Sequence, residues 1–278
     1  MKLADICNKK KIGLINEEVG MKKITTAILM TILFSHVFAG TIDPAVPDGK
    51  YVEYGKKYKC VLPIAGIFGD KLNTQFKATC VVIDEYHILT SAHVVENTIT
   101  QHVIFEGKAY PCVLVATHAL HSNKKGQHDI ALARLQRPIK LDYYPPLYSE
   151  RDEVGKVCGL AGYGNRGDFN SGYNINGFDN QRRAGSNIID SVEDNVLTYS
   201  VHGKNRTELE FMIAPGDSGG GLFIDQKLAG IHSYVYATDG KADSDYGDVG
   251  CSTRVSDYIE WIERTKNTIE TILKEARK

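Results

Sequence analysis

The chain has 278 residues, of which 42% are hydrophobic and 24% are charged, and its formal net charge is −1. This composition is that of an ordinary globular protein, long enough for one domain or two fused barrels. Because no overall positive charge attracts polyanions, we expect neither a nucleic acid nor an anionic membrane surface as a partner.

Residues 21–39 have the order of a secretory signal: two lysines, an apolar stretch over 24–34, and a small residue, Ala39, at the end. We expect cleavage after Ala39 and a secreted or periplasmic location. The alternative, a short membrane anchor, is disfavoured because polar residues interrupt an apolar run that is already short for a span. We therefore expect no membrane contact after signal removal.

Two further segments flank this signal. Residues 1–20 are polar and precede it, so Met21 is an alternative start of translation and the extension is a candidate untranslated segment. Residues 40–50 are rich in Pro, Asp and Gly and are predicted to be an extended leader and candidate propeptide. The folded domain is predicted over 51–278.

Short apolar runs bounded by turn residues fill both halves of this domain. In the first half they cover 60–67, 76–83, 87–92, 102–105, 111–116 and 130–135. In the second half they cover 156–163, 195–201, 208–213, 221–224, 228–236 and 249–255. Many short strands rich in Val and Ile predict an all-β antiparallel barrel or sandwich and argue against alternating β/α units. Two sets place a first barrel at about 58–140 and a second at about 150–255.

Two other segments stand out. Residues 162–186 are crowded with Gly and Asn and predict a mobile surface loop. Isoleucines at helical spacing predict a C-terminal α-helix over about 256–277, with Ser256 as its N-cap.

The clearest chemical signal is the segment Ala-Pro-Gly-Asp-Ser-Gly-Gly-Gly-Leu at 214–222. A serine between glycines, directly before an apolar run, suits a tight turn that presents a hydroxyl and directs backbone N–H groups to one point. Acyl transfer needs both features. Upstream, His93 ends an apolar strand and Asp129 begins another. The chain thus offers a base, an orienting acid and a nucleophile in the order His93, Asp129, Ser218.

In these three motifs the sequence resembles the trypsin/chymotrypsin-like serine protease family. The resemblance implies two six-stranded antiparallel β-barrels, a C-terminal helix and a site in the cleft between the barrels. It implies that His93 accepts the proton of Ser218, that Asp129 orients His93, and that the N–H groups of Gly216 and Ser218 form the oxyanion hole. It implies no metal and no cofactor.

In the trypsin-like family the aspartate that matches Asp217 pairs with an N-terminal amine released by zymogen cleavage. No Ile-Val-Gly-Gly occurs in this chain. Lys50 lies about where the family's activation site would, so a cut after Lys50, and hence a zymogen, is a hypothesis.

The resemblance also assigns a substrate-binding pocket. Met212 would form its base, and the strand Ser233-Tyr234-Val235 would pair with the substrate backbone. Val235 and Gly250 would line its walls. Because Met212 stands where an aspartate selects Lys or Arg, and a buried cation without a carboxylate is unfavourable, we predict cleavage after small or medium apolar residues.

Five cysteines follow the signal: Cys60, Cys80, Cys112, Cys158 and Cys251. An oxidising compartment permits a disulfide bond, but the number is odd and the pairing stays open. Because no Cys-x-x-Cys occurs, we expect no structural zinc site.

These observations predict a secreted serine endopeptidase that works through an acyl-enzyme. Its predicted partners are a protein or peptide substrate and, as a further candidate, a protein inhibitor. The alternative is a catalytically inactive homologue that binds a partner through the same cleft. A serine esterase with the α/β-hydrolase order does not fit, because His93 and Asp129 both precede Ser218. The oligomeric state stays open.

Overall fold

The computed structural model describes residues 40–70, 74–122, 126–201 and 206–276, which all belong to one unit, His36–Lys278. The predicted signal and the polar extension before it lie outside the described residues. Among the described residues, no helix is both long enough and apolar enough to cross a membrane.

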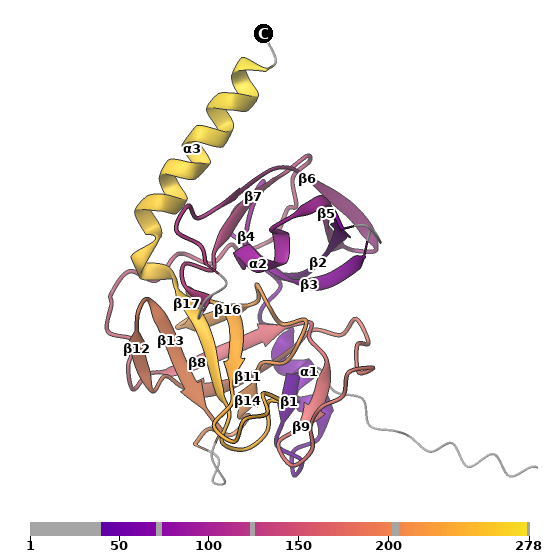
Figure 1. The fold of residues 1–278 in the computed structure, drawn as a ribbon, viewed down its shortest axis with the longest axis vertical. Coiled ribbons are helices and arrows are strands. Elements are labelled where there is room, and N and C mark those ends of the chain that lie inside the picture. Colours follow the sequence, from indigo (N-terminus) through magenta and orange to yellow (C-terminus); the bar gives the residue numbers. More distant parts are fainter. Residues whose placement is uncertain (1–39, 71–73, 123–125, 202–205, 277–278) are drawn as a thin grey trace, which may run out of the picture. The chain divides into compact units, whose positions relative to one another are not determined.

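Six strands of the first half close into an antiparallel barrel in the order β2-β3-β4-β7-β6-β5 (Figure 1). They are β2 (Val61–Phe68), β3 (Gln75–Val82), β4 (His87–Thr90), β5 (Thr98–Phe105), β6 (Lys108–Thr117) and β7 (Ala131–Leu135). A four-residue helix, α2 (Ala92–Val95), follows β4. Aliphatic side chains such as Ile64, Ile88 and Val103 fill the barrel and are fully buried. This is the first barrel that the sequence predicted.

The second half forms a seven-stranded antiparallel sheet in the order β11-β8-β15-β16-β17-β13-β12. Its strands are β8 (Val157–Gly162), β11 (Arg183–Ile188), β12 (Ser191–Glu193), β13 (Val196–Ser200), β15 (Gly221–Ile224), β16 (Lys227–Tyr236) and β17 (Val249–Arg254). The all-β class is confirmed, but this half differs from the predicted closed six-stranded barrel. The end strands β11 and β12 do not pair with each other, and β14 (Phe211–Met212) joins another sheet.

That other sheet has the order β10-β9-β1-β14 and includes the first described residues of the chain. Its remaining strands are β1 (Gly40–Ile42), β9 (Arg166–Asp168) and β10 (Gly172–Tyr173). Strand β1 runs parallel to β9 and antiparallel to β14. Helix α1 (Asp48–Gly55) follows and lies beside β11 (Figure 1).

Two segments that were predicted to be irregular contain regular secondary structure. Residues 40–50 were predicted to be an extended leader, but they form β1 and the start of α1. Residues 162–186 were predicted to be a mobile loop, but they contain β9, β10 and the start of β11. Both depend on distant partners: β9 pairs with β1, and Arg183, which is 2% exposed, forms ion pairs with Asp48 and Asp179.

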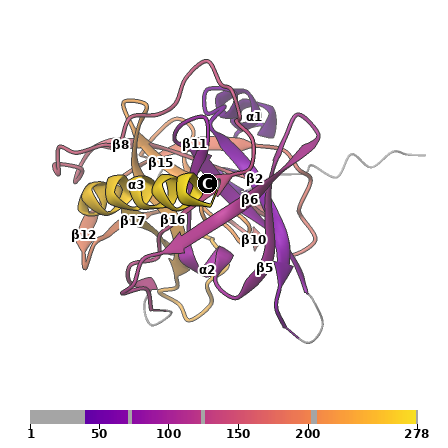
Figure 2. The same ribbon diagram turned by 90° about the horizontal axis from the view of Figure 1, so that it is seen from above.

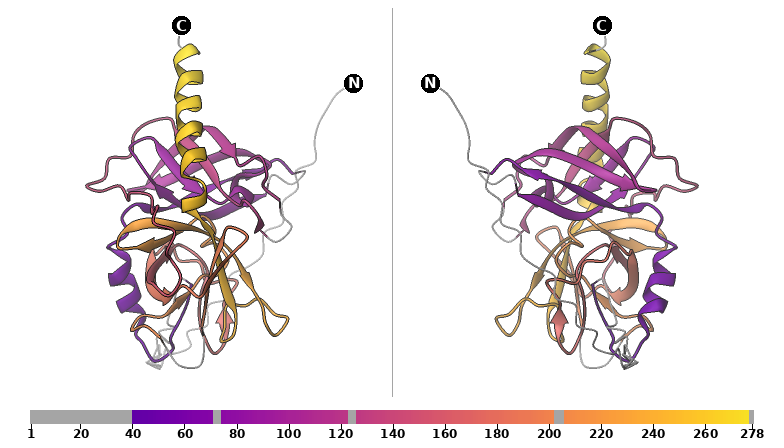
Figure 3. Two further views of the ribbon diagram at one scale, coloured as in Figure 1. Left: turned by 90° about the vertical axis from the view of Figure 1, so that its left-hand side faces the viewer. Right: turned by 90° about the vertical axis from the view of Figure 1, so that its right-hand side faces the viewer.

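The chain ends in a 3₁₀ turn, Val255–Asp257, followed by helix α3 (Ile259–Glu275). Figures 2 and 3 show α3 lying beside the barrel strands and extending past them. Ile262 and Ile269 are buried against the core, as the helical spacing predicted. Ser256 is not the N-cap, because its hydroxyl instead donates a hydrogen bond to Glu153 Oε1 (3.0 Å).

The five described cysteines are all unpaired. Four of them are buried, and burial raises the pKa of each thiol, to about 12 for Cys60 and Cys158. They therefore pack as small apolar side chains in the cores of the two halves. The structure gives no support to the expected disulfide bond.

Candidate active site

His93 and Asp129 form a close pair at the boundary between the barrel and the second half. His93 lies in α2, directly after β4, and Asp129 lies two residues before β7. The His93 ring Nδ1 is 2.7 Å from Asp129 Oδ2, and the His93 backbone N–H donates to Asp129 Oδ1 at 2.9 Å. The carboxylate thus fixes both the backbone and the ring of His93. The His93 side chain is 35% exposed, whereas that of Asp129 is 2% exposed.

A third donor reaches the same carboxylate from the second half. Ser233 in β16 is buried, and its Oγ donates to Asp129 Oδ2 at 2.5 Å. The pairing of β16 with β17 shifts register between His232 and Tyr234, so Ser233 sits at an irregularity. Such a bulge redirects a side chain away from the regular sheet pattern. Ser233 was predicted to contact substrate, and its role as a donor to Asp129 was not foreseen.

These contacts determine the charge of Asp129. Burial alone would raise the pKa of its carboxyl, but the hydrogen bond and charge of the His93 ring, together with the hydrogen bonds from Ser233 and from the His93 N–H, hold the pKa below its ordinary value. Asp129 is therefore ionised at neutral pH.

Ser218 lies in a turn between β14 and β15 that depends on glycine. Gly216 and Gly219, on either side of it, have φ angles of 99° and 83°, which residues other than glycine rarely adopt. A Cβ at Gly219 would lie 2.1 Å from Thr90 Oγ1 and 2.2 Å from the Thr79 carbonyl oxygen. The turn therefore packs directly against the barrel, while Ser218 itself is half-exposed.

Two carbonyl acceptors connect this turn to the barrel. The Ser218 carbonyl accepts the N–H of Thr79 in β3 at 3.0 Å. The His232 carbonyl accepts both the Gly219 N–H (2.8 Å) and the hydroxyl of Ser91, two residues before His93. Among the described residues, Ser218 Oγ and His93 make no hydrogen bond with each other. Catalytic contacts often tighten only when substrate binds.

The N–H groups of Gly216 and Ser218 have no hydrogen-bond acceptor within the described part of the chain. The neighbouring N–H groups of the same turn are hydrogen-bonded: the Asp217 N–H donates to the Ala214 carbonyl, and the Gly219 N–H donates to the His232 carbonyl. Two free donors at one turn suit the binding of an oxyanion.

Asp217, between those two donors, is fully buried. Its Oδ1 accepts the Gly164 N–H at 2.7 Å, and its Oδ2 accepts the Ala214 N–H at 2.9 Å. No cation lies within ion-pair distance of it among the described residues. Burial raises its pKa to about 7 in spite of these two hydrogen bonds.

The residues predicted for the substrate pocket lie together. Val235 and Gly250 are cross-strand neighbours on β16 and β17, and a Cβ on Gly250 would lie 2.9 Å from Met212 Sδ. The same Cβ would lie 2.3 Å from the ring of Tyr199, a residue that the sequence did not single out. Met212 and Tyr199 are both fully buried. Tyr234, the remaining predicted residue, is half-buried next to Ser233.

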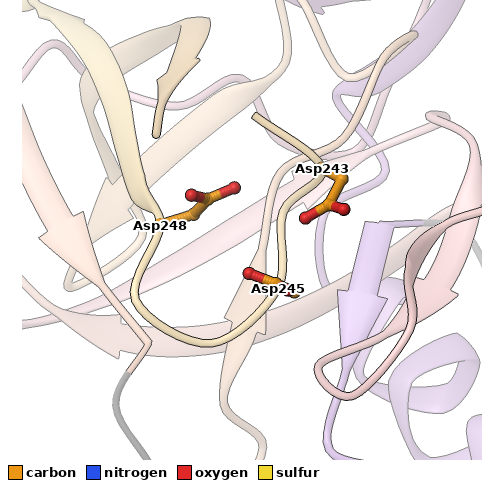
Figure 4. Close-up of side chains that lie close together, drawn as sticks. All are labelled: Asp243, Asp245 and Asp248. Atoms are coloured by element: carbon orange, nitrogen blue, oxygen red, sulfur yellow. The ribbon is translucent and has the colours of Figure 1, made fainter. Parts of the chain in front are cut away.

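Three carboxylates gather in the loop that leads into β17. Figure 4 shows Asp243, Asp245 and Asp248 directed toward one another, and one oxygen of each lies within 4.8 Å of the others. Asp243 also pairs with Lys241. Burial, and then the charge of the other carboxylates, raises the pKa of Asp245 and Asp248. Among the described residues, this is the group whose ligand atoms could surround a metal ion.

A cavity of about 1140 Å³ opens elsewhere, on the face formed by β2, β3 and β5. Its lining includes Lys77 and Phe178, with the ammonium of Lys77 4.7 Å from the centre of the Phe178 ring. None of the predicted site residues lines it. The candidate site therefore rests on its hydrogen bonds and not on the size of a cavity.

Comparisons with known proteins concern the family and the fold. The family model described as Trypsin matches residues 67–262. Among solved structures, HL collagenase is similar, with a TM-score of 0.59 and 17% sequence identity over 83% of this chain and 99% of the collagenase chain. At that identity the likeness concerns the fold. A search of curated proteins finds no match.

Proposed function

This chain belongs to the trypsin family, and from that membership and the site geometry we propose that it is a secreted or periplasmic serine endopeptidase. Ser218 attacks the substrate carbonyl, His93 takes the hydroxyl proton and later gives it to the leaving amine, and Asp129 orients the ring. The observation that carries the proposal is the 2.7 Å contact between His93 Nδ1 and Asp129 Oδ2. It leaves Nε2 of a partly exposed ring available on the opposite side.

The oxyanion of the tetrahedral intermediate would be held by the N–H groups of Gly216 and Ser218. Their lack of another acceptor among the described residues supports this role. Loss of one such donor typically costs about 2.7–4 kcal/mol of transition-state stabilisation. The acyl-enzyme on Ser218 is then hydrolysed by water, with His93 as the base again. No metal or cofactor takes part in these steps.

We infer a preference for small or medium apolar side chains before the cleaved bond. Met212 and Tyr199 approach Gly250 closely and limit the depth of the space, while Val235 narrows it. Neither Met212 nor Tyr199 offers a charge to a cationic substrate, and a buried unpaired cation is costly. A peptide panel in which cleavage after Arg or Lys is fastest would contradict this preference.

We further infer that the activation ion pair joins Asp217 to the amine of Gly40. The position of strand β1 supports this inference. Gly40 pairs with Arg166, two residues after Gly164, and Thr41 pairs with Met212, two residues before Ala214. The N–H groups of Gly164 and Ala214 are the two that donate to Asp217. A buried carboxylate with its pKa raised to about 7 lacks a cation, and an ammonium group on Gly40 would supply one.

Gly40 fits this position because it has no side chain. Its φ is 63°, and a Cβ on it would lie 2.1 Å from the Phe211 ring. Removal of the signal after Ala39 would release this amine in the same step as export. A cut after Lys50 would fall within α1 and would separate β1 from the rest of the domain.

The test is the intact mass of the secreted protein before and after a fluorophosphonate serine reagent, with Ser218→Ala as control. We expect a chain that starts at Gly40 and gains one adduct, which the variant lacks. A chain that starts at Gly40 and gains no adduct would refute the enzyme and favour the inactive homologue. An adduct on a chain that starts elsewhere would refute the Gly40 ion pair and keep the enzyme.

A further inference from the structure

Three aspartates in the loop between β16 and β17 form a largely buried group. They are Asp243, Asp245 and Asp248, whose carboxylates are directed toward one another, with one oxygen of each within 4.8 Å of the others (Figure 4). Asp248 is 1% exposed and Asp243 is 9% exposed. Water and salt screen acidic groups on an open surface. Burial weakens that screening, so three like charges this close are unfavourable without a cation.

The described residues supply little positive charge to this group. Lys241 pairs with Asp243 Oδ2, but the Lys241 side chain is 75% exposed, and a pair with so exposed a partner contributes little to stability. Within the described part of the chain, Asp245 and Asp248 form no ion pair. One exposed ammonium therefore faces three carboxylates, and the group keeps a net negative charge.

Two oxygen atoms at this group are buried and have no hydrogen-bond partner among the residues that the structure describes. One is Oδ1 of Asp243, on the carboxylate that Figure 4 shows directed toward the other two. The other is the hydroxyl oxygen of Ser244, the next residue, which is 0% exposed. Buried polar atoms are nearly always paired, and an unpaired carboxylate oxygen is costly. Asp243 Oδ1 is therefore available as a ligand for a cation.

The neighbouring backbone holds these carboxylates in place. The Ser244 N–H donates to Asp248 Oδ2 at 2.8 Å, and the Tyr173 N–H of β10 donates to the Asp243 carbonyl at 2.8 Å. A Cβ on Gly172 would lie 2.9 Å from Asp243 Cγ, so β10 packs directly against this carboxyl group. Because the ligands are already held together, little conformational freedom is lost when an ion binds.

We propose that Asp243, Asp245 and Asp248 bind one Ca²⁺ ion, with Asp243 Oδ1 as one of its ligands. Carboxylate oxygens are hard ligands that suit Ca²⁺, Mg²⁺ and Mn²⁺. Oxygens bound to Ca²⁺ lie about 2.3–2.6 Å from it, so two of them are at most about 5 Å apart, which agrees with the 4.8 Å limit. Mg²⁺ needs shorter bonds and keeps several waters, which suits buried carboxylates less well.

The ion joins segments that are far apart in the chain. The Ser244 carbonyl, within the group, accepts the hydroxyl of Thr41 in β1 at 2.5 Å. Strand β17, which carries Gly250, begins directly after Asp248. Calcium therefore stabilises the loop that lies between β1 and β17, and with it the fold of the second half. Calcium binding here does not depend on the proposed catalysis.

The test is calorimetry and thermal unfolding of Ser218→Ala protein, in which the proposed nucleophile cannot cut the chain during the measurement. After treatment with EDTA, calorimetry should show one Ca²⁺ bound per chain with a Kd of about 10⁻⁴–10⁻³ M, the range of extracellular sites. Addition of about 10 mM CaCl₂ should raise the melting temperature by about 3–10 °C. The same concentration of MgCl₂ should give less than half of this rise. About 30 mM NaCl, which matches the ionic strength, should give none.

Asp245→Asn is the informative variant, because Asp245 is the least buried of the three aspartates and its replacement disturbs the fold least. It should lose most of the calcium-dependent rise in melting temperature. Without calcium it should melt at the same temperature as its parent or higher, because one of three like charges is gone. Asp239→Asn is the matched control: Asp239 is exposed in the same loop but outside the group, so this variant should keep the rise.

Three results would overturn the proposal. The first is that calorimetry detects no bound Ca²⁺ at about 10 mM. The second is that MgCl₂ or NaCl raises the melting temperature as much as CaCl₂, which would show general screening of charge. The third is that Asp245→Asn keeps the rise, or that Asp239→Asn loses it to the same extent. All three are read without turnover, so they are separate from the outcome of the serine-reagent test.

Discussion

Replacing Ser233 by alanine tests how firmly the second half holds Asp129. The change removes one of three hydrogen bonds to the carboxylate of Asp129, whose side chain is 2% exposed, and Ser233 itself is 5% exposed. A hydrogen bond to a charged group contributes about 1.5–3 kcal/mol to stability. Because solvent does not readily replace the lost donor in a buried site, we expect the free energy of unfolding at pH 7 to fall by about 2–3 kcal/mol.

The sign of the pH dependence follows from Asp129. Its pKa in the folded protein lies below the ordinary value, so its contacts contribute stability above about pH 4, the ordinary pKa of a carboxyl in an unfolded chain. That contribution is lost as the pH falls through the lower, folded pKa. The difference between wild type and Ser233→Ala should therefore be full at pH 7 and smaller at about pH 3.

Urea unfolding at both pH values measures the effect. Ser171→Ala is the matched control, because Ser171 also donates to an aspartate, Asp168 (2.8 Å), but on the exposed surface. We expect this control to change stability by less than about 0.5 kcal/mol. A loss below about 0.5 kcal/mol for Ser233→Ala, or an equal loss at pH 3 and pH 7, would refute the reasoning.

Three further changes test other parts of the site. Gly219→Ala should lower the free energy of unfolding, measured in urea, by more than about 3 kcal/mol. Gly155 has nearly the same φ (81°) but open space around it, so Gly155→Ala should lower it by about 1–2 kcal/mol. Equal losses would contradict the predicted clash at Gly219. In a chain that keeps residues before Gly40, the raised pKa of Asp217 should make the free energy of unfolding fall by roughly 1.4 kcal/mol per pH unit as the pH rises from about 4 to 7. Asp217→Asn should remove this slope. A slope that survives the substitution would show that a group other than Asp217 causes it. Val235→Gly should raise kcat/KM for phenylalanine before the cleaved bond at least about tenfold relative to alanine; unchanged ratios would place the pocket wall elsewhere.

The sequence was sufficient where local pattern decides structure. All six predicted strands of the barrel occur, because each is an apolar run bounded by turn residues and each pairs with a neighbour. The same holds for β15, β16 and β17. The sequence singled out His93, Asp129 and Ser218 because each follows or precedes such a run, and the structure puts His93 and Asp129 in contact.

What the sequence missed depends on pairing between distant segments. Strand β1 has only three residues, and its partners lie more than a hundred positions away. No local period reveals such a strand. The contact of Ser233 with Asp129 was missed for the same reason, because a bulge in β16 directs Ser233 to Asp129.

The open sheet of the second half has a free edge at β11, and an unpaired strand edge can pair with another copy of the chain. Here the edge is covered. Helix α1 lies along it, with Arg182 donating to the Gly55 carbonyl at 2.8 Å, and the Ser186 N–H is used by the Leu209 carbonyl at 2.6 Å. Truncation of the segment at the start of the domain would uncover this edge, so we expect it to lower the solubility of the protein before it alters the barrel.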